Sequence, residues 1–359
     1  MKIAKCDIVP YVRPFRRPIR FAYGTFSERS GYYIDITTTE GITGSGEIAP
    51  LPLYRPVDTN AVESVLSKFQ KKIIGWEIPH AASEIETVIR DIVPLNFEET
   101  FGIASALLDA AARTERKPLA GLLNKNYRPD VDVNCLITPP IENMEALAEA
   151  IQAKRYQAAK IKVGARTIQE DAEFTKEVAA ALGSTISLRL DANRAWSLRQ
   201  AIDFFRRIDG VAIDYIEEPV SGGHDELQAF RASTGVSVAL DESLISYRDI
   251  MDAAGDDNCD IIIIKPSLLY GPATTILACE TLVSNGKRVV VSSLLETETG
   301  MASLIHLASA LPDVTEPAGL DTLSYFAEYS SRLSLVTDGA IRVPEGLGNG
   351  YERSHSGPR

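Results

Sequence analysis

The sequence predicts an α/β protein, a modified TIM-type (β/α)7β barrel with an N-terminal α+β capping domain. From about residue 131, short β-branched runs alternate with amphipathic helical stretches, which is typical of a parallel sheet. One marker residue from each run gives gaps of 24 to 29 residues, so the βα unit has a nearly constant length. About eight such units favour a closed barrel over an open, doubly wound sheet. The markers are Cys135, Lys162, Asp191, Glu217, Asp241, Lys265, Ser292 and Gly319.

The residues before the barrel predict a separate α+β domain. Residues 31–38 are rich in aromatic and β-branched side chains and predict a strand. Residues 43–52 predict a short strand that leads into a proline-rich loop. Strands followed by several helices are typical of a small α+β domain. The helical patterns lie at residues 61–74, 83–92 and 98–113.

We expect three parts along the chain. The capping domain covers residues 1–125, and the barrel with its active site covers residues 126–320. The tail, residues 321–359, contains an irregular stretch rich in glycine and proline. We expect this tail to pack back on the capping domain and complete it.

The composition limits the partners of the protein. The 359 residues carry a formal net charge of −12, and the sequence pI is about 5.0. Nucleic acids and anionic membranes attract basic proteins, so we expect neither as a partner. A small anionic substrate stays compatible with this charge, because a site can be locally positive. The sequence does not indicate an oligomeric state.

The cysteines and the apolar runs indicate the compartment. Four cysteines lie far apart and form no Cys-x-x-Cys pair, which favours reduced thiols over disulfides or a zinc site. No apolar run approaches the roughly 18 residues of a membrane span. The N-terminus lacks the apolar core of a signal peptide. We therefore expect a cytoplasmic protein.

Charged side chains follow the apolar runs of five successive predicted strands. Active sites of β/α barrels lie at the C-terminal ends of the strands. One such charge is as consistent with a surface position as with a site, but five in phase favour a site. The residues are Lys160 and Lys162, Asp191, Glu217, Asp241 and Lys265.

The three acidic residues predict a metal site. Carboxylates on adjacent strands cannot converge without compensation, because like charges disfavour each other's ionisation. Mg²⁺ prefers oxygen ligands of this kind, and Mn²⁺ could substitute for it. No histidine or cysteine accompanies the three acids in the pattern, which argues against zinc and copper.

The lysines predict a catalytic base. Lys160 and Lys162 share one face of their strand, because side chains alternate between faces. A solvated edge strand, protected by two lysines, is the alternative interpretation. In a closed site, burial and neighbouring cations lower the pKa of a lysine, so that it can act as a base near pH 7. A base of this kind beside a divalent metal suits abstraction of a proton next to a carboxylate.

Nine stretches together resemble the enolase superfamily, in its muconate-lactonising subgroup with a Lys-x-Lys signature. The resemblance covers nearly the whole chain, and within the subgroup it is strongest to the o-succinylbenzoate synthases through "LDANRAW" and "GLDTL". The stretches are "KIKVG", "LRLDANRAW", "IEEP", "LDESL", "IIKPSL", "VVSSLLET", "AGLDTL", "GEIAPLP" and "FGIASALLDAA".

The resemblance implies a role for each charged residue. Lys162 is the base, Lys160 holds down its pKa, and Lys265 stabilises charge from across the site. The metal ligands are Asp191, Glu217 and Asp241. Residues that resemble the substrate pocket of the family are Arg189, Asn193, Ser292, Ser293 and Gly319, together with Tyr23, Phe26, Leu53 and Tyr54 in loops of the capping domain. For Arg189, a buried structural ion pair is an equally good interpretation.

The resemblance also implies a reaction. We expect Mg²⁺-dependent dehydration of 2-succinyl-6-hydroxy-2,4-cyclohexadiene-1-carboxylate to o-succinylbenzoate, a step towards menaquinone. Epimerisation of dipeptides or racemisation of N-acylamino acids is the first alternative, since the same metal ligands and lysines serve both. Dipeptide epimerases hold the substrate amino group with Asp-x-Asp near the eighth strand, whereas this chain has Asp321 but Leu323. A non-catalytic barrel that binds metal and ligand is the second alternative.

Overall fold

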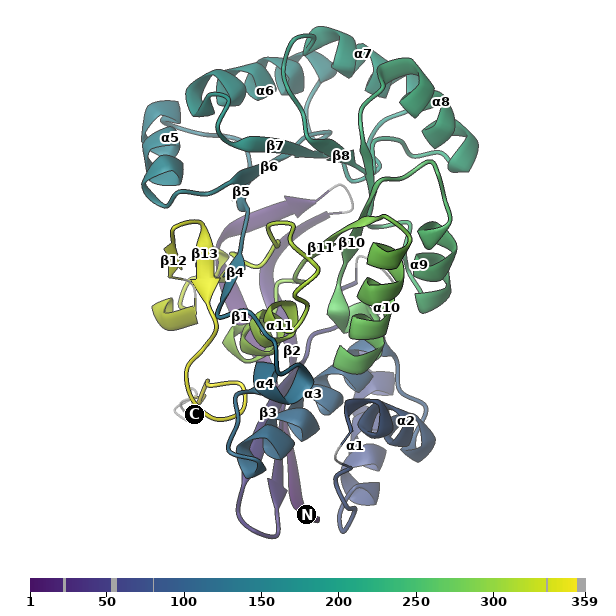
Figure 1. Cartoon of the computed structure of the whole chain (residues 1–359), viewed down its shortest axis with the longest axis vertical. Helices are drawn as coiled ribbons and strands as arrows, with labels where there is room; N and C mark the ends of the chain where they lie inside the picture. Colours follow the sequence, from purple (N-terminus) through teal and green to yellow (C-terminus); the bar gives the residue numbers. More distant parts are fainter. Residues whose placement is uncertain (22–23, 53–56, 80, 334, 354–359) are drawn as a thin grey trace.

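A computed structural model of the chain describes residues 1–359 except 22–23, 53–56, 80, 334 and 354–359. Within these residues, an antiparallel sheet with its helices forms the N-terminal part and a parallel β/α barrel forms most of the rest (Figure 1). The predicted fold class is therefore confirmed. Tyr23, Leu53 and Tyr54, which the sequence placed near the substrate, lie outside the described residues.

The N-terminal sheet has three strands in the order β1-β2-β3. Its first strand contains three prolines, which the ladder tolerates because β1 lies at the edge of the sheet and pairs only with β2 in it. Gly46 lets helix α3 pack closely on β3, since a Cβ at Gly46 would lie 2.0 Å from the carbonyl oxygen of Gly102. The elements are β1 (Ile3–Phe21), β2 (Gly24–Thr38), β3 (Thr43–Ile48), α1 (Thr59–Lys72), α2 (Ala82–Ile92), α3 (Phe97–Thr114) and α4 (Leu119–Leu123).

Seven parallel strands form the barrel sheet, in the order β11-β10-β9-β8-β7-β6-β5. The eighth predicted run closes the barrel with two residues. Ala318 bridges to Val133, and Gly319 bridges to Ser292 beyond β11. The strands are β5 (Cys135–Ile137), β6 (Ala158–Lys162), β7 (Ser187–Asp191), β8 (Tyr215–Glu217), β9 (Val238–Leu240), β10 (Ile261–Ile264) and β11 (Arg288–Val291).

Helices surround the sheet, and α5 to α8 form an arc outside it (Figure 1). Two of these helices start at capping boxes, a pattern that can be recognised in the sequence. Thr167 with Glu170 caps α6, and Ser197 with Gln200 caps α7. The helices are α5 (Met144–Ala153), α6 (Ile168–Leu182), α7 (Leu198–Arg207), α8 (His224–Thr234), α9 (Tyr247–Ala254), α10 (Pro272–Ser284) and α11 (Glu298–Ser309).

The tail contacts both the barrel and the N-terminal domain. Strand β13 (Ala340–Arg342) pairs with β12 (Val336–Thr337) and with β4 (Asp130–Asp132), which precedes the barrel. Further on, the backbone of Asn349 donates to Asp109 on α3 over 2.7 Å. The three-part division of the chain at residues 125 and 320 stays a prediction.

Buried carboxylates of the N-terminal domain cap two barrel helices. Glu47 on β3 accepts from the backbone of Thr297 (2.9 Å) and Gly300 (2.8 Å), at the start of α11. Glu86 on α2 accepts from the backbone of Ala273 (2.5 Å) and Thr274 (3.0 Å), at the start of α10. Negative charge is favourable at a helix N-terminus, where backbone N–H groups lack partners within the helix. These two contacts fix the N-terminal domain against the barrel.

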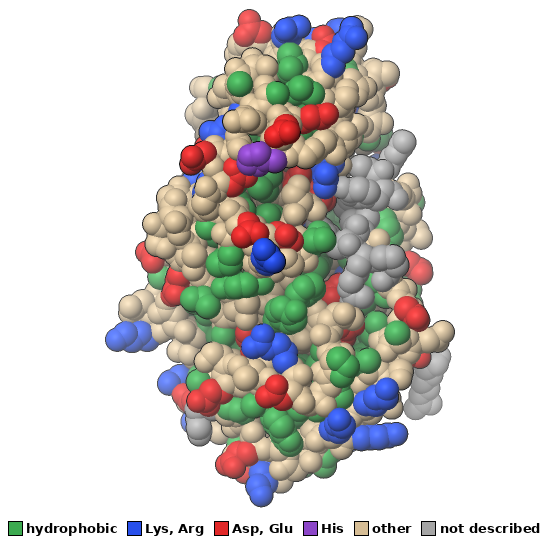
Figure 2. All heavy atoms as spheres, turned by 90° about the vertical axis from the view of Figure 1, so that its right-hand side faces the viewer, with side chains coloured by type: hydrophobic (Ala, Val, Ile, Leu, Met, Phe, Trp, Pro, Cys, Tyr) green, Lys and Arg blue, Asp and Glu red, His purple; other side chains and the backbone are tan. Residues whose placement is uncertain are grey.

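The surface carries charges of both signs. On the face seen in Figure 2, acidic and basic side chains are interspersed with hydrophobic ones. Among the helices of the described ranges, none is both long and apolar enough to cross a bilayer.

We predict that His306 makes the protein less stable in acid. This residue of α11 is fully buried, its Nδ1 accepts from the backbone of Ala120, and burial lowers its pKa from 6.5 to about 4. The unfolded chain therefore binds a proton below pH 6.5 that the folded chain refuses until about pH 4. The free energy of unfolding should fall by about 3 kcal/mol across this window.

Urea unfolding between pH 7 and pH 4 measures this dependence. His306→Asn keeps an acceptor near the position of Nδ1 but does not titrate, so its stability should fall less than that of the wild type over the same range. Equal slopes for the two proteins would contradict the assignment.

Candidate active site

A pocket opens at the C-terminal ends of the barrel strands. Charged and polar side chains form its floor, and Leu51, Leu294 and Leu295 contribute an apolar wall. Leu51 follows β3 of the N-terminal domain, so both domains contribute to the pocket. The predicted pocket residues Asn193, Ser292, Ser293 and Gly319 line it, together with Lys160, Lys162, Asp191, Asp241 and Lys265.

The parallel register brings charged residues of adjacent strands into one layer. Lys162 on β6 lies opposite Asp191 on β7, and Asp191 lies opposite Glu217 on β8. Each of these residues ends its strand, so the three side chains meet at the barrel mouth. The alternation of apolar and charged residues in the sequence predicted this face.

Two lysines share one carboxylate oxygen. The Nζ of Lys162 lies 2.6 Å from Oδ2 of Asp191, and the Nζ of Lys160 lies 3.0 Å from the same atom. Lys162 also donates to Oδ1 of Asn193 over 2.8 Å, and Lys160 lies 3.1 Å from Oε2 of Glu217. These contacts fix both ammonium groups on the β6 side of the pocket.

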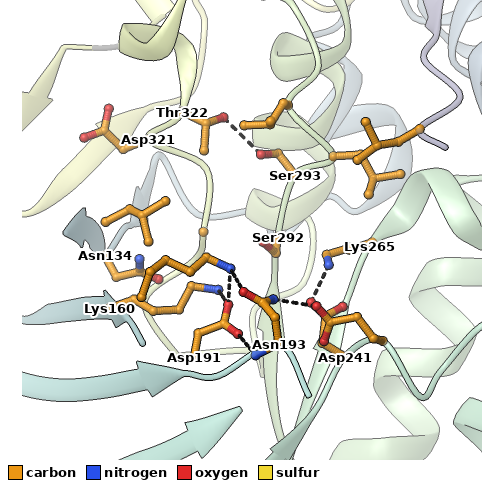
Figure 3. Close-up of a pocket in the computed structure, with 17 residues that line it drawn as sticks. Asn134, Lys160, Asp191, Asn193, Asp241, Lys265, Ser292, Ser293, Asp321 and Thr322 are labelled. Carbon is orange, nitrogen blue, oxygen red and sulfur yellow. Dashed lines mark hydrogen bonds and ion pairs between the residues drawn. The ribbon is translucent and has the colours of Figure 1, made fainter. Parts of the chain in front are cut away.

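The third lysine, Lys265, lies on the other side of the pocket from the lysines of β6. Lys265 directly follows β10 and forms an ion pair with Asp241, which follows β9. Figure 3 shows Lys160 and Lys265 on opposite sides, with Asp191, Asn193 and Asp241 between them. A ligand in this pocket would therefore have an ammonium group on each side.

The acidic residues fit a divalent cation. Asp191 and Glu217 are fully buried and Asp241 nearly so. Carboxylate oxygens of Glu217, Asp241 and Glu242 lie within 4.8 Å of one another, and this group contains no histidine or cysteine. Asp191 lies beside Glu217 but is bound to the two lysines. An all-oxygen set of this kind suits Mg²⁺ or Mn²⁺.

Sequence reasoning missed Glu242. Strict strand alternation would point it away from Asp241, but β9 ends at Leu240 and the chain turns, so both carboxylates face the site. Asn193 donates to Oε1 of Glu242 over 2.5 Å, which links Glu242 to Lys162. Burial and the neighbouring Asp241 raise the pKa of Glu242 to about 7.

The remaining shifts in pKa follow from burial and from neighbouring charges. Burial favours the neutral form of Asp191, but Lys162 and Lys160 overcome it and lower its pKa. For Glu217, burial and the nearby Asp191 raise the pKa. Burial alone would lower the pKa of Lys160, yet Glu217 and Asp191 raise it well above its ordinary value. Asp241 raises the pKa of Lys265 in the same way. Lys160 therefore stays a cation, as its expected role beside Lys162 requires.

Arg189 is a correction to the predicted pocket. It lies opposite Lys160 in the sheet, one layer below the mouth, and does not line the pocket. Its Nη2 lies 2.6 Å from Glu316 and its Nε 3.4 Å from Asp214, so the guanidinium is neutralised inside the barrel. Strand alternation correctly predicted the face of the sheet on which Arg189 lies, but it does not predict how deep in the barrel the side chain lies. The alternative interpretation, a buried structural ion pair, describes this residue.

The pocket contains further residues that the sequence did not single out for it. Ser293 and Thr322 form a hydroxyl pair, with Oγ and Oγ1 3.0 Å apart. Phe26, predicted to face the substrate, packs against the large hydrophobic core. The unpredicted lining residues are Asn134, Leu136, Glu242, Leu294, Leu295 and Thr322. Asp321 and Leu51 also line the pocket, and Leu51 lies in the loop of residues 50–54 that was expected to face the substrate.

Two sequence families match the chain. Residues 4–124 match the N-terminal domain of mandelate racemase and muconate lactonizing enzyme, and residues 143–356 match the enolase C-terminal domain-like family. The chain therefore belongs to the enolase superfamily, and its two-part match places it with enzymes of the mandelate racemase and muconate lactonizing type.

Characterised relatives of this type catalyse several reactions. A chloromuconate cycloisomerase of Delftia acidovorans is 24% identical, over 99% of this chain and 97% of its own. The L-Ala-D/L-Glu epimerase of Bacillus subtilis strain 168 is 26% identical, over 88% of this chain and 87% of its own. The chain is thus similar to a cycloisomerase and to an epimerase.

Solved structures share the fold across nearly the whole chain. A dipeptide epimerase from Enterococcus faecalis V583, in complex with Mg and L-Leu-L-Tyr, superposes with a TM-score of 0.85 at 24% identity, covering 98% of this chain and 99% of its own. The N-succinyl Arg/Lys racemase of Bacillus cereus ATCC 14579 superposes with a TM-score of 0.85 at 22% identity, covering 99% of this chain and 96% of its own.

We predict that Arg189 supports the barrel and does not bind substrate. Arg189→Met would leave Glu316 and Asp214 with only Arg288 as a cation among their described partners. The free energy of unfolding should fall by about 3 kcal/mol. Urea denaturation measures this loss, and the substrate KM should stay within about twofold of wild type. A large rise in KM with unchanged stability would restore the pocket role.

Proposed function

We propose that the protein is a divalent-cation-dependent enzyme that removes the proton α to a substrate carboxylate. One observation carries the proposal: lysine side chains on both sides of the pocket flank a cluster of buried carboxylates. Lys162, at the end of β6, contacts Asp191, and Lys265, directly after β10, contacts Asp241. Figure 3 shows Lys160, on the same strand as Lys162, across the pocket from Lys265. Simple ligand binding does not require a lysine on each side of a metal site.

We infer that Asp191, Glu217 and Asp241 hold Mg²⁺, which Mn²⁺ can replace. Glu242 lies close enough to Glu217 and Asp241 to join them. When bound, the cation would supply positive charge that offsets the negative charge developing on the substrate carboxylate. It would also take over carboxylate oxygens that the lysines now contact.

Lys162 is the base in this proposal. Its Nζ accepts the α-proton, while the electron pair of the C–H bond moves towards the substrate carboxylate. Asp191 and Asn193 fix the position of Nζ. Lys160 remains charged beside it, bound to Asp191 and Glu217. Lys265 places positive charge on the opposite face of the substrate.

The residues of the chain itself support dehydration as the finer activity. The substrate would be 2-succinyl-6-hydroxy-2,4-cyclohexadiene-1-carboxylate, and the products o-succinylbenzoate and water. After Lys162 takes the α-proton, the carbanion electrons form the new double bond, the β-hydroxyl leaves, and Lys162 returns the proton to it. Support comes from "LDANRAW" and "GLDTL" and from the apolar wall of Leu51, Leu294 and Leu295, which suits a ring.

Racemisation of N-acylamino acids or epimerisation of dipeptides is the second candidate. The comparisons support it more directly than dehydration, since relatives that align over most of the chain include an epimerase and a racemase. Lysines on both faces suit proton removal from one face and return to the other. Within this candidate, an N-acyl substrate fits better, because Asp321 already accepts from Tyr156 and Leu323 is buried and apolar.

We predict that Lys162 carries the proton transfer. In deuterated water, the wild type should exchange the α-proton of a substrate, and Lys162→Ala should lower this rate by about 10² to 10⁴-fold for the enantiomer whose proton faces β6. Proton NMR measures the exchange. Lys176→Ala, an exposed lysine on α6, is the matched control and should keep the wild-type rate. Full exchange in Lys162→Ala would contradict the assignment.

The products distinguish the two candidates. Ultraviolet absorbance follows o-succinylbenzoate formed from the cyclohexadiene substrate, and polarimetry follows N-succinylamino acids and dipeptides. We expect dehydration. Racemisation without o-succinylbenzoate would favour the second candidate, in which Lys265→Ala should keep α-exchange with one enantiomer only. No exchange with any of these carboxylates would contradict the proposed function.

We predict that Mg²⁺ stabilises the protein through the acidic cluster. Metal at about 100 times its dissociation constant should raise the free energy of unfolding by about 2.7 kcal/mol. Thermal unfolding with EDTA and with Mg²⁺ measures the shift without an activity assay. Asp241→Asn should fold but lose the shift, whereas Asp249→Asn, on the outer helix α9, should keep it. An equal shift in both variants would contradict the metal site.

A further inference from the structure

Arg29 is a buried guanidinium that joins the two domains beside the pocket. It lies on β2 and is only 2% exposed. Buried arginines usually pair with carboxylates. Within the described residues, the hydrogen bonds of Arg29 end instead on four backbone carbonyls. Its Nε donates to Leu294 (3.3 Å), its Nη1 to Pro50 (2.7 Å) and Ser30 (2.9 Å), and its Nη2 to Ala49.

Three of these carbonyls belong to the two loops that carry the apolar wall. Ala49 and Pro50 directly precede Leu51 in the loop after β3. Leu294 lies in the loop between β11 and α11. Leu51 and Leu294 both line the pocket, and they pack with Leu268 in a small hydrophobic cluster. One side chain therefore fixes a loop of each domain at the wall of the site.

Other hydrogen bonds hold one of these two loops, the barrel loop between β11 and α11. The backbone N–H of Leu294 donates to Glu296 over 2.6 Å, and Glu47 holds Thr297 at the far end of the same loop. These contacts hold the barrel loop, but they do not reach the backbone around Leu51. Arg29 ties that segment to the barrel loop through the planar guanidinium, whose five donors diverge in fixed directions.

We propose that Arg29 is a positioning residue that sets how tightly the pocket binds the apolar part of its substrate. It acts through Leu51 and Leu294 and does not touch the substrate. The inference rests on the proposed function and deepens it. A ring or alkyl group beside the reactive carboxylate contacts this wall, while the lysines and carboxylates on the floor perform proton transfer. Loosening the wall therefore weakens binding and leaves the chemical step intact.

Arg29→Lys tests the role, because lysine keeps the charge but has one nitrogen in place of the three that reach the carbonyls of Leu294, Pro50 and Ala49. We expect KM for a substrate with a ring or alkyl group to rise about tenfold, with kcat within threefold of wild type. Arg13→Lys is the matched control. Arg13 also joins β1 to distant parts of the chain, through Glu298 at 3.1 Å and the carbonyl of Glu328 in the tail. Among the described residues, its hydrogen bonds and ion pairs do not involve Leu51, Leu294 or Leu295. Its KM should stay within twofold.

A second measurement needs no substrate. Amide hydrogen exchange at Ala49 and Leu51 and in residues 292–297 should become at least tenfold faster in Arg29→Lys and stay unchanged in Arg13→Lys. Unchanged exchange in these segments overturns the inference even if the variant is less stable. A fall in kcat at constant KM overturns it as well. If the wild type acts on none of the tested carboxylates, the proposed function fails, and the exchange result still decides whether Arg29 fixes the wall.

Discussion

The architecture of the site depends on the balance of charge within one buried layer. Three carboxylates that are nearly or fully buried meet three lysines at the barrel mouth. Taking such groups out of water is costly unless opposite charges compensate them. The lysines provide this compensation in the structure, and a divalent cation would add to it. Any substitution that changes the number of charges in the layer therefore disturbs the remaining groups, not only its own position.

The barrel and its charged mouth could be predicted from the sequence because both follow local periodicity. Strand alternation assigns Lys162 and Asp191 to one face, and the constant length of the βα unit brings successive strands to the same edge. Periodicity does not give depth, which is why Arg189 was placed one layer too high. It also fails beyond a strand end, where the turn after Leu240 brings Glu242 into the site.

The contacts between the domains could not be predicted in the same way. Glu47, Glu86 and Arg29 bind backbone groups of Thr297, Thr274 and Leu294, far away in the chain. Every residue except proline offers the same backbone N–H, and every residue offers the same carbonyl. No residue type at the receiving end marks the partner. Only the folded arrangement shows that these buried charges hold helix ends and loops together.

The pocket separates two kinds of residue. Strands β6 to β10 and the residues directly after them carry the three lysines and the clustered carboxylates, whereas the loop after β11 and the N-terminal domain carry the apolar wall of Leu294, Leu295 and Leu51. The walls can therefore change in shape during evolution without disturbing the charge balance of the floor.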